Sequence, residues 1–181
     1  MKKFVIISMI SILAVSSLFT GCIQTGSGTL KLQITDDPSK LNISSAFVTI
    51  SSVMVHKADF GSDDNDSDSN ESDAGWYTIA EDNQTYDLIT LVNATDIIGI
   101  TDLDVGWYTQ IRLLVERALV TIDGIEYDLQ IPSKNVKLIT PFEIELNTTL
   151  ILTLDFDVHE SVHETGNGKY IMNPTITVIK E

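Results

Sequence analysis

The chain has 181 residues, of which 43% are hydrophobic, and its 26 acidic and 11 basic residues give a net charge of −15 at pH 7. Such a charge repels phosphate backbones and anionic lipid headgroups, so nucleic acids are excluded as natural partners. Cations, cationic proteins and neutral glycans remain compatible with it, and the length suits one domain with a substantial core.

The first segment, residues 1–21, predicts a lipoprotein signal peptide. Two lysines precede a short apolar stretch that leads through small residues to Cys22. The stretch is too short for an ordinary membrane span. Cys22 is the one cysteine of the chain, so the exported domain holds no disulfide. We expect Cys22 to be lipidated, residues 22–27 to form a short tether, and the protein to be extracytoplasmic on the outer face of the cell membrane. The alternatives are an uncleaved signal anchor and an incidental cysteine.

Residues 28–181 predict a single all-β domain, an antiparallel β-sandwich of transthyretin-like or immunoglobulin-like general architecture. Helical periodicity is not sustained for ten residues anywhere after the signal peptide. Asp123-Gly124 predicts a two-residue hairpin turn. Apolar and polar residues instead alternate, as in strands with one buried face, along 30–35, 125–131, 142–147 and 149–158.

One segment, 58–75, departs from this pattern, with seven acidic residues and no basic one. We expect an exposed acidic loop inserted between two neighbouring strands. Asp64, Asp66 and Asp68 have the spacing of the first three ligands of an EF-hand calcium loop. The glycine and glutamate that such a loop needs further along are absent, so a solvated, mobile loop is the simpler interpretation and weak calcium binding is the alternative.

Six asparagines stand in N-x-S/T sequons, which is the acceptor pattern for N-glycosylation. All of them fall in predicted loops or at strand ends, where an acceptor must lie. With the lipoprotein signal and the high acidity, they favour a glycoprotein on an archaeal cell surface. The six are Asn42, Asn65, Asn70, Asn83, Asn93 and Asn147.

Two Gly-Trp-Tyr triplets place Trp76 and Trp107 beside Tyr77 and Tyr108. Consecutive residues of a strand point to opposite faces, so one member of each pair is expected in the core. The other could pack at the sheet edge or serve as a platform on which a ligand stacks. Trp76 and Trp107 are the candidates for that platform.

The string His159-Glu160-Ser161-Val162-His163 has the H-E-x-x-H pattern of zinc hydrolases. In those enzymes both histidines lie on one helix, and a third protein ligand completes the site. Here the predicted strand runs up to the string, and two glycines follow within five residues of His163. We therefore expect a polar connection with solvated histidines, and zinc hydrolysis is a distant alternative.

Asp155 and Asp157 flank Phe156 near the end of a predicted strand, so both carboxylates share one face. They could hold a structural calcium ion together with Asp36 and Asp37, or serve as paired carboxylates in glycoside hydrolysis. The simplest interpretation is a polar sheet face with a turn-capping aspartate. No other metal site and no cofactor is expected.

Several strings occur in an order that resembles a known family, and the joined "DFD", "TGNGKY" and following proline strand is the most specific of them. The chain resembles domain of unknown function 4382, a family of exported bacterial and archaeal proteins, from residue 28 onward. The resemblance implies an envelope-associated β-sandwich without an established activity. The strings are "TDDPS", "VTISSVMVH", "GWYTI", "YDLITLVN", "LDVGWYTQIRLLVE" and "LTLDFDVHESVHETGNGKYIMNPTITVI".

These observations predict a membrane-anchored, cell-surface protein that is not an enzyme. We expect it to bind a ligand, a cell-envelope glycan or a surface protein through a β-sandwich module. The alternative is a structural component of a surface layer. An exposed strand edge would favour assembly, and a deep pocket lined by Trp76 or Trp107 would favour ligand binding.

Overall fold

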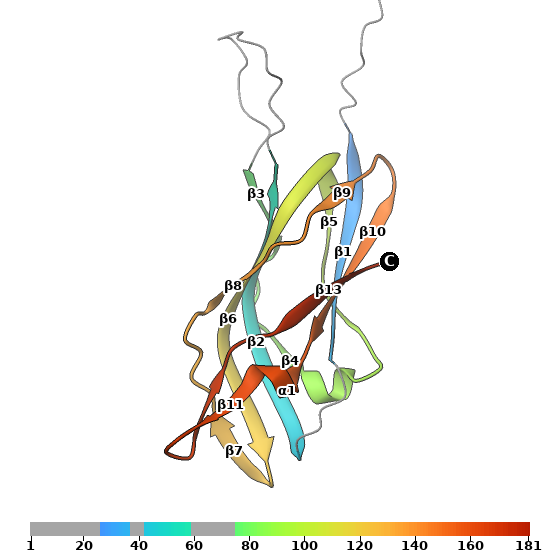
Figure 1. Ribbon diagram of the computed structural model, residues 1–181. Coiled ribbons are helices and arrows are strands. Elements are labelled where there is room, and N and C mark those ends of the chain that lie inside the picture. Colours follow the sequence, from blue (N-terminus) through green and yellow to red (C-terminus); the bar gives the residue numbers. More distant parts are fainter. Residues whose placement is uncertain (1–25, 37–41, 59–74) are drawn as a thin grey trace, which may run out of the picture.

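The computed structural model of the protein describes residues 26–36, 42–58 and 75–181 (Figure 1). The signal peptide 1–21, Cys22, and most of the acidic segment, with Asp64, Asp66, Asp68, Asn65 and Asn70, lie outside the described residues. The described part consists almost entirely of strands in antiparallel sheets that pack together, which confirms the all-β sandwich.

One layer of the sandwich is a four-stranded sheet in the order β13-β10-β1-β5. Its inner strands β1 and β10 are parallel, whereas both outer pairs are antiparallel. The prediction of an entirely antiparallel sandwich is wrong at this one pair. A parallel pair needs a long connection, and here most of the chain lies between the two strands. The strands are β1 (Ser27–Asp36), β5 (Asp96–Asp104), β10 (Thr149–Phe156) and β13 (Ile176–Lys180).

The other layer is a seven-stranded sheet built around two long antiparallel strands, β2 (Ile43–Lys57) and β6 (Gly106–Ile122). Several register shifts interrupt this pair, and such bulges bend and twist strands. The long strands consequently exchange partners along their length: β2 pairs first with β4 and then with β3, and β6 pairs in turn with β9, β8 and β7. The short partners are β3 (Gly75–Ala80), β4 (Gln84–Asp87), β7 (Ile125–Asp128), β8 (Asn135–Leu138) and β9 (Phe142–Ile144).

Three small elements complete the fold. A 3₁₀ turn η1 (Leu88–Leu91) follows β4, and a one-turn helix α1 (Val158–Ser161) follows β10. The chain then forms a separate two-stranded hairpin, β11 (Val162–Thr165) with β12 (Lys169–Met172). Among the described residues, no helix is long and apolar enough to cross a membrane.

The core lies between the two sheets and contains one cluster of buried apolar side chains from both. The predicted alternation is confirmed in β1, where Leu30, Leu32 and Ile34 are fully buried. It fails at Ile125, which is 57% exposed. Ile125 begins β7 directly after a hairpin turn at the lower end of the sheet in Figure 1, where the four-stranded sheet no longer covers it.

The predicted turn at Asp123-Gly124 is confirmed, because Asp123 has φ 51° and Gly124 has φ 79° between the paired strands β6 and β7. Two consecutive positive φ angles are the geometry of a type I′ hairpin turn. The acidic segment also joins neighbours, as predicted: β2 and β3 pair, with Lys57 opposite Gly75. The strand predicted over 149–158 ends earlier, at Phe156, where the next two residues begin the helix α1.

Candidate ligand-binding surfaces

The two tryptophans lie on the outer face of the seven-stranded sheet, as the alternation predicts. Trp76 is 38% exposed and Trp107 is 42% exposed. Their neighbours Tyr77 and Tyr108 point the other way, and Tyr108 is fully buried. In each Trp-Tyr pair the tyrosine therefore packs towards the core, and the tryptophan is available for contacts outside it.

Trp76 is held in place by two side chains from neighbouring strands. The His56 ring on β2 lies 4.8 Å from the indole at an angle of 56°. The guanidinium carbon of Arg112 on β6 lies 3.9 Å from the indole centroid, which is a cation–π contact. Arg112 in turn donates from Nε to Oε1 of Gln110 at 2.8 Å. The result, which we call the Trp76 platform (Trp76, His56, Gln110 and Arg112), is an aromatic and hydrogen-bonding surface on rigid strands.

Trp107 has different surroundings at the end of the same sheet. It lies opposite Glu143 of β9, while the adjacent Tyr108 stacks on Phe142 with centroids 5.3 Å apart. The Tyr108 hydroxyl donates to the backbone oxygen of Asp104 at 3.0 Å. No ring contact joins Trp107 to Trp76 in the part of the chain that the structure describes. The sheet therefore carries two separate tryptophans and not a continuous aromatic floor.

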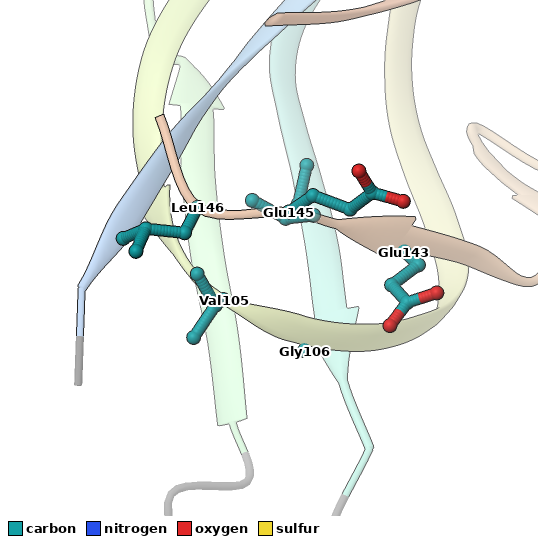
Figure 2. Close-up of a pocket in the computed structure, with 6 residues that line it drawn as sticks. Val105, Gly106, Glu143, Glu145 and Leu146 are labelled. Atoms are coloured by element: carbon teal, nitrogen blue, oxygen red, sulfur yellow. The ribbon is translucent and has the colours of Figure 1, made fainter. Parts of the chain in front are cut away.

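A pocket of about 460 Å³ lies beside Trp107 without including it. Figure 2 shows that its wall consists of Val105 and Gly106 on one side and the segment Glu143–Leu146 on the other. Its two charged lining residues, Glu143 and Glu145, are both acidic. This pocket is not lined by Trp76 or Trp107, and its carboxylates would favour a cationic occupant.

A second pocket, of about 330 Å³, lies where the β11–β12 hairpin meets β7. We call it the tyrosine pocket, and its lining residues are Tyr127, Asp128, Gln130, Gly168, Lys169 and Tyr170. The rings of Tyr127 and Tyr170 are 4.6 Å apart at an angle of 58°. The pKa of Tyr170 is raised, first by burial and then by the nearby charge of Glu164.

The basic side chains that the structure describes differ in whether they form an ion pair with a carboxylate. Three of them pair with carboxylates: Lys134 with Glu116 at 2.7 Å, Arg117 with Asp128 at 3.2 Å and Lys57 with Asp104 at 3.7 Å. The hydrogen bond and charge of Lys134 lower the pKa of Glu116. Arg112 in the Trp76 platform and Lys169 in the tyrosine pocket form no ion pair with any described residue.

The H-E-x-x-H string is divided between two elements. His159 and Glu160 lie in α1, but that helix ends at Ser161, and His163 is an exposed residue of strand β11. Neither histidine is buried, whereas Val158 and Ser161 are fully buried. In residues 26–36, 42–58 and 75–181, no three His, Cys, Asp or Glu side chains are grouped so that they could hold a metal ion.

Asp157 caps the helix α1 with its side chain. Its Oδ1 accepts from the backbone nitrogen of Glu160 at 2.8 Å, and its backbone oxygen accepts from Ser161 Oγ at 2.5 Å. The neighbouring Asp155 lies part-buried on β10 beside Thr35 of β1. Asp36 is buried and accepts from the backbone nitrogen of Val158 at 3.1 Å. The turn-capping interpretation of Asp157 therefore has a direct geometric basis, and calcium binding by Asp155 and Asp157 stays a prediction.

The four described sequon asparagines are all exposed and lie outside strands, as predicted. Asn93 and Asn147 occupy turns with positive φ angles of 61° and 54°. Asn42 donates from its side-chain amide to Asp123 at 2.5 Å. Asn83 lies between β3 and β4.

Sequence reasoning missed the partners of Trp76 and the whole tyrosine pocket. Arg112 lies 36 residues after Trp76 in the chain, and Tyr170 lies 43 residues after Tyr127. Only strand pairing across the sheet, and the docking of the hairpin, bring them together. The "TGNGKY" string offered one signal: its Gly168, Lys169 and Tyr170 line the pocket.

Comparisons with known proteins gave one match. Neither the curated proteins nor the solved structures contain a match to this chain. The family model named domain of unknown function matches residues 27–174, which include the seven-stranded sheet, every strand of the four-stranded sheet except β13, the Trp76 platform and the tyrosine pocket. With most of its length matched, and with the strings identified in its sequence now placed in a sandwich, the chain belongs to the family of domain of unknown function 4382.

Proposed function

We propose that the protein is a non-catalytic binding module of the cell surface, anchored through a lipid on Cys22, which uses the Trp76 platform to bind an envelope glycan or a surface protein. The observation that carries this proposal is the Trp76 platform itself. An indole that is 38% exposed contacts both the His56 ring and the Arg112 guanidinium, which come from the next two strands of the sheet. Preorganised aromatic and arginine side chains are the residue types that dominate binding energy at protein surfaces.

A non-catalytic role is supported by the division of the H-E-x-x-H string. Its two histidines come from a one-turn helix and a strand, whereas the zinc chemistry needs them one turn apart on a single helix. Of the two carboxylates that were candidates for glycoside hydrolysis, Asp157 is engaged in capping α1.

The anchor would orient the module. Gly26, whose backbone oxygen accepts from Val105 at 2.9 Å, lies four positions after Cys22 in the chain. At about 3.5 Å per residue, the anchor lies within about 14 Å of that end of the sandwich. β1 begins at the upper end in Figure 1, and the tyrosine pocket between β7 and the β11–β12 hairpin lies at the lower end. In this orientation the tyrosine pocket faces away from the membrane.

The test compares Trp76→Ala with Trp107→Ala in the full-length protein, using binding to isolated cell envelopes as the measurement. Removing an exposed aromatic anchor typically weakens binding by about 2 kcal/mol, or roughly thirtyfold. We expect that loss for Trp76→Ala and a smaller one for Trp107→Ala, which lacks the flanking arginine. Equal binding by the wild-type protein and both variants would reject the platform.

A second candidate function, assembly into a surface layer, is favoured by the edge strand β13. The backbone N–H of Glu181 donates to the backbone oxygen of Ile151, and the backbone N–H of Asp157 donates to the backbone oxygen of Thr175. These two bonds fix which residues of β13 are hydrogen-bonded to β10. The alternate residues Ile176, Val178 and Lys180 then direct their backbone groups away from β10. No other described strand pairs with this edge. Such an edge can add a strand from another molecule.

Proline at Val178 tests the assembly directly. It removes an N–H group from the open edge without removing a hydrogen bond to β10. If copies associate through β13, Val178→Pro should shift an oligomer to monomers in sedimentation analysis. A wild-type protein that is monomeric at every accessible concentration would reject this candidate.

A further inference from the structure

The tyrosine pocket has the composition of a small-ligand site, although no sequence motif identified it. Its volume of about 330 Å³ is near the lower end of the range of roughly 300–1,000 Å³ for ligand pockets. It combines two aromatic rings with an amide, a carboxylate and an ammonium group, from Tyr127, Tyr170, Gln130, Asp128 and Lys169. An apolar ligand would leave these polar groups without partners, which disfavours it.

The rings and the polar groups are complementary to different parts of one type of molecule. A sugar ring has a face of C–H groups that packs on an aromatic side chain, and hydroxyl groups at its rim that need donors and acceptors. The tilted Tyr127 and Tyr170 rings, 4.6 Å apart, offer the apolar wall. Gln130 both donates and accepts, Asp128 accepts, and Lys169 donates.

The two charged groups of the pocket, Asp128 and Lys169, differ in whether they already form an ion pair. Asp128 is held by Arg117 at 3.2 Å, so its charge is already compensated. Lys169 forms no ion pair with any residue that the structure describes. An acidic group on the ligand would therefore find one free cation in the pocket.

A bound ligand would also stabilise the β11–β12 hairpin that forms one wall of the pocket. The β11–β12 hairpin is a separate two-stranded sheet, and isolated hairpins are only marginally stable. It is tied to the segment after β7 by two backbone hydrogen bonds at Gln130, to Tyr170 at 3.2 Å and from Met172 at 2.9 Å. A molecule bound between Tyr127 and Tyr170 would add contacts across this junction.

From these contacts we propose that the tyrosine pocket is a saccharide-binding site that takes one or two sugar units and prefers an acidic sugar over a neutral one. The tyrosine rings pack on the sugar ring, Gln130 and Asp128 bind its hydroxyl groups, and Lys169 binds its carboxylate. The site is separate from the Trp76 platform and does not depend on it.

Titration calorimetry on the full-length protein tests the proposal with glucose, N-acetylglucosamine and glucuronic acid. Single sugars held by a few hydrogen bonds should bind with dissociation constants of about 1 mM. Glucuronic acid should bind more tightly than glucose, and Lys169→Ala should abolish that difference without weakening glucose to the same extent. Loss of the side-chain hydrogen bonds of Gln130 in Gln130→Ala should weaken every sugar that binds by about fivefold to tenfold.

Two variants separate binding from folding. Tyr170→Phe keeps the ring and the hairpin packing, so binding should persist with a modest loss. Lys137→Ala, at an exposed lysine of β8 that does not line the pocket, is the matched control for Lys169→Ala and should leave sugar binding unchanged. The proposal is overturned if none of the three sugars binds, if Gln130→Ala and Lys169→Ala bind as the wild type does, or if Lys137→Ala removes the binding.

Discussion

Gly28 shows how tightly single residues are constrained where β1 enters the sandwich. A Cβ atom at this position would overlap the backbone oxygen of Glu145 and would lie 2.9 Å from Ile144 Cγ2 and 3.1 Å from the Thr148 oxygen. The obstacle is mostly backbone, which cannot turn away as a side chain can. The glycine therefore allows β1 to pack closely against the connection from β9 to β10.

Gly28→Ala should lower the free energy of unfolding by about 1–3 kcal/mol, the usual cost of overpacking. Gly75→Ala is the matched control, because a Cβ there would meet nothing within 4 Å. Urea denaturation of both variants measures the difference. Similar stabilities for the two variants would show that β1 can shift away from the connection.

Tyr86 makes the stability of the protein depend on pH. Burial, and secondarily the charge of Asp96, raise the pKa of Tyr86 from 10.0 to about 12. Its hydroxyl donates to Gln84 Oε1 at 2.5 Å. The folded protein thus favours the neutral phenol, so this contribution to stability is complete below pH 10 and is lost as the pH rises towards 12.

Replacing Tyr86 with phenylalanine should remove that part of the pH dependence. A pKa raised from 10.0 to about 12 corresponds to a change of roughly 2–3 kcal/mol in the free energy of unfolding across that pH range. Urea unfolding of the wild type and Tyr86→Phe from neutral pH to beyond pH 10 should show the two free energies converging at high pH. Parallel curves would mean that Tyr86 does not ionise with unfolding.

At the scale of elements, the short helix α1 depends on its cap. It contains only four residues, and a helix of this length has little stability of its own. Asp157 accepts from the Glu160 N–H, and Ser161, fully buried, donates from its hydroxyl to the Asp157 backbone oxygen. The buried Val158 fixes the other side of the turn. The cap therefore positions the start of the β11–β12 hairpin.

Asp157→Ala should destabilise the protein by about 0.5–2 kcal/mol through loss of the cap. Asp157→Asn should cost much less, because asparagine also caps helices. Measuring both variants in calcium and in a chelator distinguishes the two roles considered for this carboxylate. A destabilisation that appears only in the presence of calcium would identify a metal ligand and not a cap.

At the scale of the whole molecule, the two ends of the sandwich differ. The upper end in Figure 1 holds the start of β1, the acidic pocket of Glu143 and Glu145, and the ends of β2 and β3 that flank the acidic segment. The lower end holds the tyrosine pocket. If Cys22 carries the anchor, the pocket of Glu143 and Glu145 lies at the end near the membrane and the tyrosine pocket lies at the opposite end.

Cys22→Ser should release the protein from the membrane fraction into the soluble fraction, because Cys22 is the one residue that can carry the lipid. Fractionation of cells with an immunoblot measures this release, and mass spectrometry of the wild type should find acyl chains on Cys22. A Cys22→Ser variant that remains in the membrane fraction would contradict lipid anchoring.

The sequence by itself determined what depends on local pattern. Alternation at Leu30, Leu32 and Ile34 predicted their burial, and Asp123-Gly124 predicted its turn, because strand period and turn geometry are properties of neighbouring residues. The helix-breaking glycines predicted that the H-E-x-x-H string could not form a long helix. The family followed from strings of this kind.

The tertiary structure alone decided which distant residues meet. The parallel pairing of β1 with β10, the guanidinium of Arg112 over Trp76, and the approach of Tyr170 to Tyr127 join residues far apart in the chain. Strand pairing and hairpin docking set these contacts, and both are chosen by the burial of the whole core and not by any local sequence. Both candidate binding surfaces are of this kind, so their composition became visible only in the folded molecule.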